Sequence, residues 1–175
     1  MVFFISVLVL VVFQRLSELV WAKRNERWMK ERGAAEYGKS HYPWMVFIHI
    51  SFFISLIIEV TFLHREPSSY WPVFLVIFLL VQGIRIWILV SMGRYWNTKI
   101  IVLPGSETIK KGPFRYMRHP NYFVVTIELA VLPLMFQAYW TAVLFFIFNQ
   151  VILSVRIAEE EKALRKYTDY PPTQK

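Results

Sequence analysis

Long apolar runs alternate with short polar segments along this chain. An α-helix needs roughly 17–25 mostly apolar residues to cross a bilayer. Runs of about that length predict five spanning helices, at approximately Val2–Ala22, Pro43–Leu63, Tyr70–Met92, Pro120–Phe136 and Ala138–Val155. The pattern therefore predicts an all-α fold, a multi-pass transmembrane helical bundle.

The last two runs are expected to form a hairpin. The stretch 120–155 is too long for a single crossing. Pro133 and Gln137 are the natural place for the chain to turn. If the fourth and fifth helices run out and back, Arg118 and His119 come to the same membrane face as Arg156, although they are distant in sequence.

The distribution of charge predicts an orientation. Lys and Arg collect in the cytoplasmic segments of membrane proteins. Residues 23–42 and 94–118 hold six of these cations each, and the tail from Arg156 onward holds five. The two opposite loops hold only Arg65, and the N-terminus holds none. We therefore expect a cell-membrane protein with its N-terminus outside and its C-terminus in the cytosol.

A basic and aromatic segment precedes the fourth predicted helix. Pro120 suits the first helical position, where its missing N–H would be unpaired in any case. His119, because it precedes a proline, is biased towards an extended backbone. The N-terminus of a helix favours a negative group such as a carboxylate. The same composition fits an interfacial anchor equally well, since Arg and Tyr are common at the headgroup level.

A second polar motif follows the fifth predicted helix. Arg156 and Glu160 are four residues apart, so on a helix they share a face. The alternative is a helix end that simply leaves the membrane, with the Arg156 side chain reaching the interface and the glutamates solvated.

Five ionisable residues interrupt the apolar runs: Arg15, Glu18, Glu59, Arg85 and Glu128. Such a charge costs about 2.5–3.5 kcal/mol at mid-helix on insertion scales. We expect these residues to pair or to line a polar cavity. Arg15 is expected to pair with a glutamate of a neighbouring helix, and Glu128 is a candidate for lining an acceptor site.

Several classes of function lack their sequence signals. The six glycines form no G-x-G-x-x-G, and no Walker A sequence is present. The basic residues lie at membrane edges, which does not favour nucleic acid as a partner. His, Asp and Glu show no metal-ligand spacing and cysteine is absent, so we expect no metal.

The two polar motifs resemble those of the isoprenylcysteine carboxyl methyltransferase family of integral membrane enzymes. The similarity lies in Gly112-Pro113-Phe114-Arg115-Tyr116-Met117-Arg118-His119-Pro120-Asn121-Tyr122 and in the Arg-x-x-x-Glu-Glu pattern of Arg156, Glu160 and Glu161. It covers roughly residues 70–167 and is closest to the small bacterial branch. Residues 1–175 are then one integral membrane domain, with a three-helix membrane part at 1–92 and a cofactor-binding, catalytic part at 93–175.

The resemblance implies S-adenosylmethionine as the cofactor, held at a cytosolic loop before the fourth helix. It implies cofactor contacts for Ser106, Glu107, Thr108, Ile109, Phe114, Tyr116, Arg118, His119, Pro120, Asn121, Tyr122 and Glu160. Arg156 matches an arginine near the acceptor. We expect Arg156, Glu160 and Glu128 to be catalytic and Arg156 and Glu128 to face the substrate, with Glu128 the candidate base for a phenol or enol.

The expected reaction is methylation of a carboxyl or hydroxyl oxygen on a lipophilic acceptor that enters from the bilayer among membrane lipids. The acceptor is either isoprenylcysteine-like or a long-chain alkylpyrone or alkylresorcinol. Phe114 departs from a tyrosine that is common in the family, Ser106 replaces a common polar position, and the tail is short. Three alternatives remain: an NADPH-dependent enzyme like sterol reductases, which carry a similar Arg-His-Pro-Asn-Tyr stretch, a phospholipid N-methyltransferase, and a non-catalytic scaffold.

Overall fold

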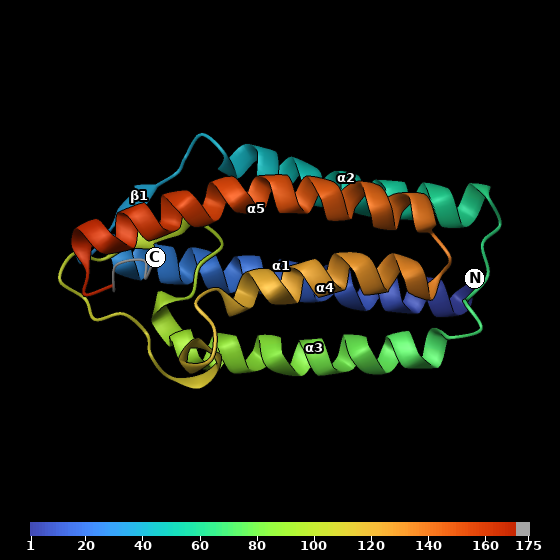
Figure 1. The fold of residues 1–175 in the computed structure, drawn as a ribbon, viewed down its shortest axis with the longest axis horizontal. Helices are drawn as coiled ribbons and strands as arrows, with labels where there is room; N and C mark the ends of the chain where they lie inside the picture. Colours follow the sequence, from blue (N-terminus) through green and yellow to red (C-terminus); the bar gives the residue numbers. More distant parts are fainter. Residues whose placement is uncertain (171–175) are drawn as a thin grey trace.

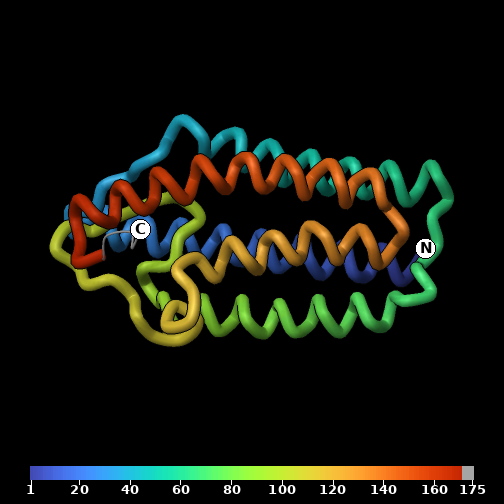
Figure 2. The backbone as a smooth tube through the Cα atoms, viewed as in Figure 1, coloured from blue at the N-terminus to red at the C-terminus, as the bar shows by residue number. Residues whose placement is uncertain are grey.

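The computed structural model describes residues 1–170 and is mostly helical (Figures 1 and 2). The long helices are α1 (Val2–Lys30), α2 (Tyr42–Phe62), α3 (Trp71–Met92), α4 (Pro120–Met135) and α5 (Tyr139–Tyr167). Two 3₁₀ turns, η1 (Gly93–Tyr95) and η2 (Gly112–Arg115), and two strands, β1 (Ala35–Tyr37) and β2 (Ile100–Val102), lie in the connections.

The five helices run antiparallel to their sequence neighbours, as predicted (Figure 1). Within the described residues, α1, α2, α3 and α5 are long and apolar enough to cross a membrane. α4 has 16 residues, which at 1.5 Å per residue is about 24 Å. The fourth predicted span is therefore shorter than the roughly 17–25 residues that a crossing needs. α1 and α5 continue to Lys30 and Tyr167, beyond the predicted Ala22 and Val155, because hydropathy marks where a helix leaves the lipid and not where it ends.

The turn between α4 and α5 confirms the predicted hairpin. α4 ends at Met135, and Gln137 adopts a left-handed backbone with φ of 55°. The Pro133 carbonyl, which lies in the last turn of α4, accepts hydrogen bonds from the N–H groups of Phe136 and Ala138 at 3.1 and 2.9 Å. The turn is therefore tight, and the two helices pack against each other.

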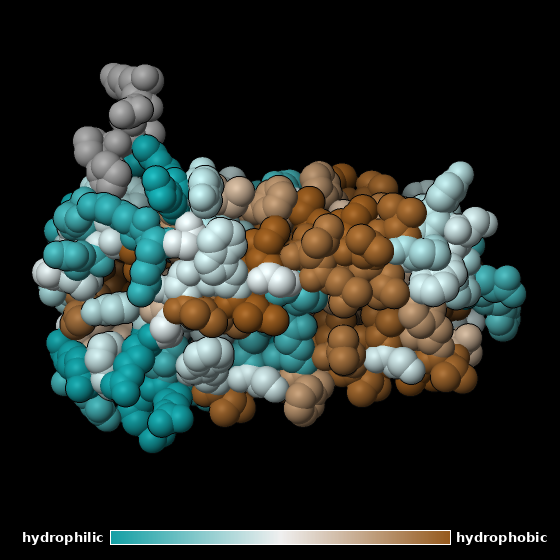
Figure 3. Space-filling model, turned by 90° about the horizontal axis from the view of Figure 1, so that it is seen from below, coloured by the Kyte–Doolittle hydropathy of each residue, from teal (hydrophilic) through white to brown (hydrophobic). Residues whose placement is uncertain are grey.

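The surface divides into an apolar part and a polar end (Figure 3). Large apolar residues on different helices are more than 70% exposed, among them Phe13, Phe62 and Trp140. Lipid is a favourable environment for such side chains. Hydrophilic residues gather at the end that carries the β1, η1 and η2 loops and the C-terminal part of α5 (Figures 1 and 3). We call this end the polar end.

A two-stranded antiparallel ribbon at the polar end was not predicted from sequence. β1 pairs with β2, with Glu36 opposite Ile101. Ile100 and Val102 pack against Ala163 of α5, and the ring of Tyr37 lies 5.2 Å from that of Tyr167. The ribbon therefore joins the loop after α1 and the loop after α3 to the C-terminal turns of α5.

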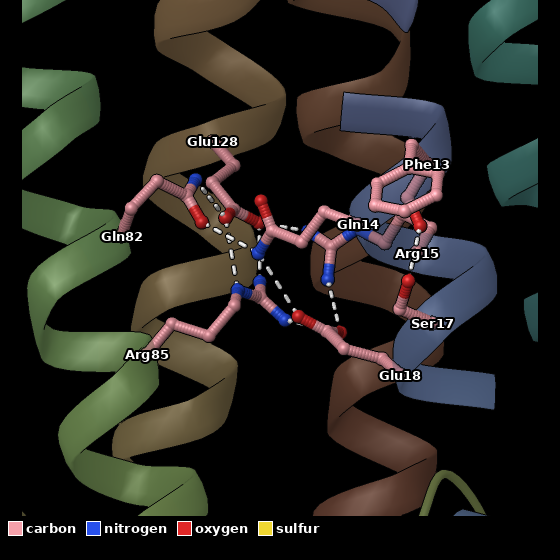
Figure 4. Close-up of polar contacts among 8 residues, drawn as sticks. All are labelled: Phe13, Gln14, Arg15, Ser17, Glu18, Gln82, Arg85 and Glu128. Carbon is pink, nitrogen blue, oxygen red and sulfur yellow. Dashed lines mark hydrogen bonds and ion pairs between the residues drawn. The ribbon is translucent and has the colours of Figure 1, made fainter. Parts of the chain in front are cut away.

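A closed network of charges joins α1, α3 and α4 inside the bundle (Figure 4). Arg85 donates from Nε to Glu128 at 3.0 Å and from Nη1 to Glu18 at 3.1 Å. Arg15 also donates to Glu18, at 3.0 Å, and both arginines contact the second oxygen of Glu128. Gln82 donates to Glu128 at 2.6 Å. The expected pairing is thus confirmed, including that of Arg15 with a glutamate of another helix.

The buried carboxylate of Glu59 in α2 is also paired within the protein, at the end of the bundle away from the polar end. Its carboxylate accepts from the backbone N–H groups of Trp140 and Thr141, at 3.2 and 2.8 Å, and from the Thr141 hydroxyl at 2.8 Å. These amides belong to the first turn of α5 and have no partner within that helix. Glu59 therefore satisfies the start of α5 from a neighbouring helix.

Replacing Glu128 with Leu should lower the free energy of unfolding by about 3 kcal/mol or more, because Arg85, which is buried, and Arg15 are then left with the single carboxylate of Glu18. The double variant Glu128→Leu/Arg85→Leu should recover more than half of the loss, since it leaves Arg15 paired with Glu18. Equilibrium unfolding in detergent micelles measures both. Glu66→Leu, on the exposed α2–α3 loop, is the control, and a double variant no better than the single one would contradict the network's role.

Candidate functional site

A cavity of about 370 Å³ lies at the polar end, between the start of α4, the C-terminal half of α5 and the loops that carry β2 and η2. Its apolar lining residues include Met29, Trp96, Ile100 and Phe114. Its polar lining residues combine basic with acidic side chains, and we call them the polar wall. The volume is within the range of roughly 300–1,000 Å³ that is typical of small-molecule sites.

Most of the predicted site residues line this one cavity. They are Ser106, Glu107, Thr108, Ile109, Phe114, Arg118, His119, Pro120, Asn121, Tyr122, Arg156 and Glu160. Two predicted residues lie elsewhere. The Tyr116 side chain is 76% exposed, with its ring 6.5 Å from that of Trp87. Glu128 lies in the charge network, where both of its oxygens accept hydrogen bonds from guanidinium groups.

Tyr122 connects α4 to α5 at the centre of the polar wall. It stands in the first turn of α4, which begins at Pro120 as predicted. Its hydroxyl donates to Glu160 and accepts from Nε of Arg156 at 2.9 Å. Arg156 and Glu160 are one turn apart on α5, so the hairpin and the helical repeat together place both beside the same phenol.

Arg156 is buried and lacks an anionic partner. The residue is only 5% exposed. Nη2 donates to the Thr98 carbonyl at 2.7 Å, and Nη1 contacts Sδ of Met45, a weak acceptor, at 3.0 Å. Within residues 1–170 no carboxylate oxygen forms an ion pair with it, whereas the equally buried Arg85 contacts two glutamates. A buried guanidinium in this position favours an anion in the cavity.

His119 forms the edge of the polar wall at the N-cap of α4. Its ring stacks on Tyr122 with centroids 5.3 Å apart and an interplanar angle of 18°. Nε2 lies 3.1 Å from a Glu161 oxygen, and Nδ1 lies 4.0 Å from Glu160. The backbone of His119, with φ of −127° and ψ of 63°, avoids the helical region, as its position before a proline favours, but its ψ falls short of the predicted extended range.

The outer rim of the cavity is held by the end of the described chain. Asp169 accepts from the Thr108 N–H and from Nζ of Lys110, both at 2.6 Å. The Lys110 ammonium, followed by the Thr108 amide, holds the pKa of Asp169 well below its usual range. The Gly105 N–H donates to the Tyr167 carbonyl at 2.9 Å. Residues 105–110 are therefore fixed against residues 167–169.

Sequence reasoning missed several residues of the cavity, including Trp96, Lys99 and Tyr170. Tyr170 lies beyond the stretch that resembles known enzymes, and no motif contains it. Its hydroxyl and Oδ1 of Asn121 are buried, and neither has a hydrogen-bond partner among the described residues. Unsatisfied polar atoms of this kind are unusual, because buried polar groups in proteins are nearly always paired.

Comparison with known proteins places these features in a family. The model of the Isoprenylcysteine carboxyl methyltransferase (ICMT) family matches residues 74–166. A Bacillus subtilis (strain 168) protein named "Uncharacterized protein YpbQ" is 50% identical over 166 residues, covering 95% of this chain and 98% of that protein. An "Uncharacterized protein" from Haemophilus influenzae is 32% identical over 142 residues, covering 81% and 83%. No solved structure matches.

The matched stretch contains both polar motifs and almost the whole polar wall of the cavity. The family consists of membrane methyltransferases, which agrees with the apolar bundle described above. The chain belongs to the isoprenylcysteine carboxyl methyltransferase family.

Proposed function

We propose that this protein transfers a methyl group from S-adenosylmethionine to an ionised oxygen of a lipophilic acceptor. The observation that carries the proposal is the buried Arg156, which has no carboxylate partner among the described residues and lines the same cavity as Glu160 and His119. An acceptor that brings its own negative charge would complete this site.

The residues of the cavity fit S-adenosylmethionine. The cofactor carries a carboxylate, an ammonium and a sulfonium, and the polar wall offers both signs of charge, from Arg118 and Lys110 to Glu160 and Glu107. The unpaired Oδ1 of Asn121 can accept a hydrogen bond from an amino or hydroxyl group. Phe114 and Tyr122 line the cavity, and aromatic faces attract a sulfonium.

When bound, the cofactor supplies an electrophilic methyl group, whose carbon–sulfur bond breaks as the new carbon–oxygen bond forms. The protein's own part is orientation. His119 and the N-terminus of α4 favour the cofactor carboxylate, and Glu160 favours its positive groups. Arg156, held by Tyr122 and the Thr98 carbonyl, positions the acceptor oxygen. Holding two reactants in line can supply about 7–11 kcal/mol of the barrier.

The charge of Arg156 favours some acceptors over others. A carboxylate, as in an isoprenylcysteine-like acceptor, is ionised at neutral pH, and so is a sufficiently acidic enol of a long-chain alkylpyrone. The phenol of an alkylresorcinol, with a pKa of about 10, is neutral there. An ionised acceptor needs no base, and Glu128 takes no part in this proposal because its oxygens are engaged by two arginines.

His119→Ala and Glu160→Ala should each weaken S-adenosylmethionine binding by more than about tenfold, since hydrogen bonds to charged groups contribute about 1.5–3 kcal/mol. Isothermal titration of the protein in detergent measures this. Glu159→Ala, which removes a neighbouring carboxylate that does not line the cavity, should bind normally. Stabilisation by NADPH in place of S-adenosylmethionine would point to the reductase alternative and sink the proposal.

Arg156→Gln should lower methylation of ionised acceptors by about 100-fold, because the acceptor loses its cation, while S-adenosylmethionine still binds. Radiolabelled methyl transfer to a prenylcysteine analogue, a long-chain hydroxypyrone and an alkylresorcinol separates acceptor classes. With the resorcinol, the wild-type rate should rise with pH as the phenol ionises near pH 10. Methylation of a phospholipid amine that is unaffected by Arg156→Gln would contradict the proposal and favour N-methylation.

We also propose that the polar end, with the cavity, faces the cytosol and that the N-terminus lies outside. The excess of Lys and Arg at this end supports it. In a bacterial host, alkaline phosphatase fused to the C-terminus should be inactive and green fluorescent protein fused there should fluoresce. Active phosphatase at the C-terminus would reverse the assignment.

A further inference from the structure

The last described residues, 167–170, cross the outer rim of the cavity, and we call them the strap. The red end of the tube meets the loop that follows β2 (Figure 2). Three hydrogen bonds hold it there: Gly105 N–H to the Tyr167 carbonyl, and Thr108 N–H and Lys110 Nζ to Asp169. The strap is thus attached to the same loop that forms the cavity wall.

Tyr170 extends from the strap to the cavity. It lines the cavity, and its hydroxyl is buried without a partner among residues 1–170. Burial, followed by the charge of Glu161, raises the pKa of its phenol, so the hydroxyl keeps its proton and remains a donor at neutral pH. Neither the family resemblance nor the family match, which ends at residue 166, includes Tyr170.

We propose that Tyr170 donates a hydrogen bond to the amino-acid end of the bound cofactor and that the strap, through Asp169, positions it for this contact. The inference rests on the proposed function, because it concerns the same cavity. Tyr170 is then a binding residue of the site, and Asp169 is a positioning residue that acts through it.

The surroundings of Tyr170 decide which end of the cofactor it meets. Charged groups of both signs lie close to it: Glu160 and Glu161 on α5, and Arg118 before α4. A zwitterion with a carboxylate and an ammonium suits such a mixed environment. Trp96 and Phe114, which line the cavity and belong to one apolar cluster with residues of α3 and α4, suit the uncharged nucleoside instead. The amino-acid end therefore lies towards the strap.

The test compares Tyr170→Phe with Tyr167→Phe, which removes a hydroxyl from the same strap but outside the cavity lining. Two ligands are titrated calorimetrically: S-adenosylhomocysteine, and 5′-methylthioadenosine, which lacks the amino-acid end. Tyr170→Phe should weaken S-adenosylhomocysteine about threefold to tenfold, as loss of one hydrogen bond implies, and leave methylthioadenosine unchanged. Tyr167→Phe should change neither.

Asp169→Asn adds a second measurement. It should speed release of S-adenosylhomocysteine in stopped flow, and combined with Tyr170→Phe it should add little, because both act on one contact. Normal binding by Tyr170→Phe, or equal weakening of both ligands, would overturn the inference while leaving the proposed function intact. If the wild-type protein bound neither S-adenosylmethionine nor S-adenosylhomocysteine, the proposed function itself would fail.

Discussion

A polar group buried between membrane helices must find its partner within the protein, because lipid offers none. This constraint organises the bundle. The carboxylates of Glu18 and Glu128 are matched by the guanidinium groups of Arg15 and Arg85, so the network is neutral and closed. Glu59 meets the free amides at the start of α5. Apart from the contact of Arg15 with Glu18, which lies within α1, these links join different helices, so satisfying the polar groups also fixes which helices are neighbours.

At the polar end the rule is met only in part, as it also is at Oδ1 of the buried Asn149 in α5. Arg156 is nearly as buried as Arg85 of the closed network, yet its guanidinium contacts a phenol, a carbonyl and a thioether. Asn121 and Tyr170 each leave a buried polar atom without a partner in the described chain. A structural network would have no reason to leave such groups open. A site that receives a charged and polar ligand would, because the ligand completes it.

The position of the cavity matters as much as its chemistry. It lies at the polar end, which adjoins the apolar part of the surface (Figure 3), as the proposed pairing of a water-soluble cofactor with a lipid-soluble acceptor requires. The α4–α5 hairpin supplies the reactive wall from two helices, and the loop after β2 supplies the rim. The strap then ties that rim to the end of α5. The rim of the cavity thus comes from connections outside the bundle, while Tyr122, Arg156 and Glu160 come from α4 and α5.

The sequence alone determined the helices and the two motifs, since both depend on local patterns. Apolar run length located the bundle, Pro120 marked the start of α4, and the four-residue spacing of Arg156 and Glu160 put them on one face of α5. Through resemblance to a family that the match then showed, the sequence also named most of the residues that line the cavity. Only the tertiary structure decided which polar groups meet. Glu128 lies within a predicted span and Arg156 directly follows one, yet Glu128 is neutralised by arginines 113 and 43 residues away whereas Arg156 has no carboxylate partner among the described residues. The short ribbon and Tyr170 carry no periodic signal, because three-residue strands and a single side chain acquire their positions from partners that are distant in the chain.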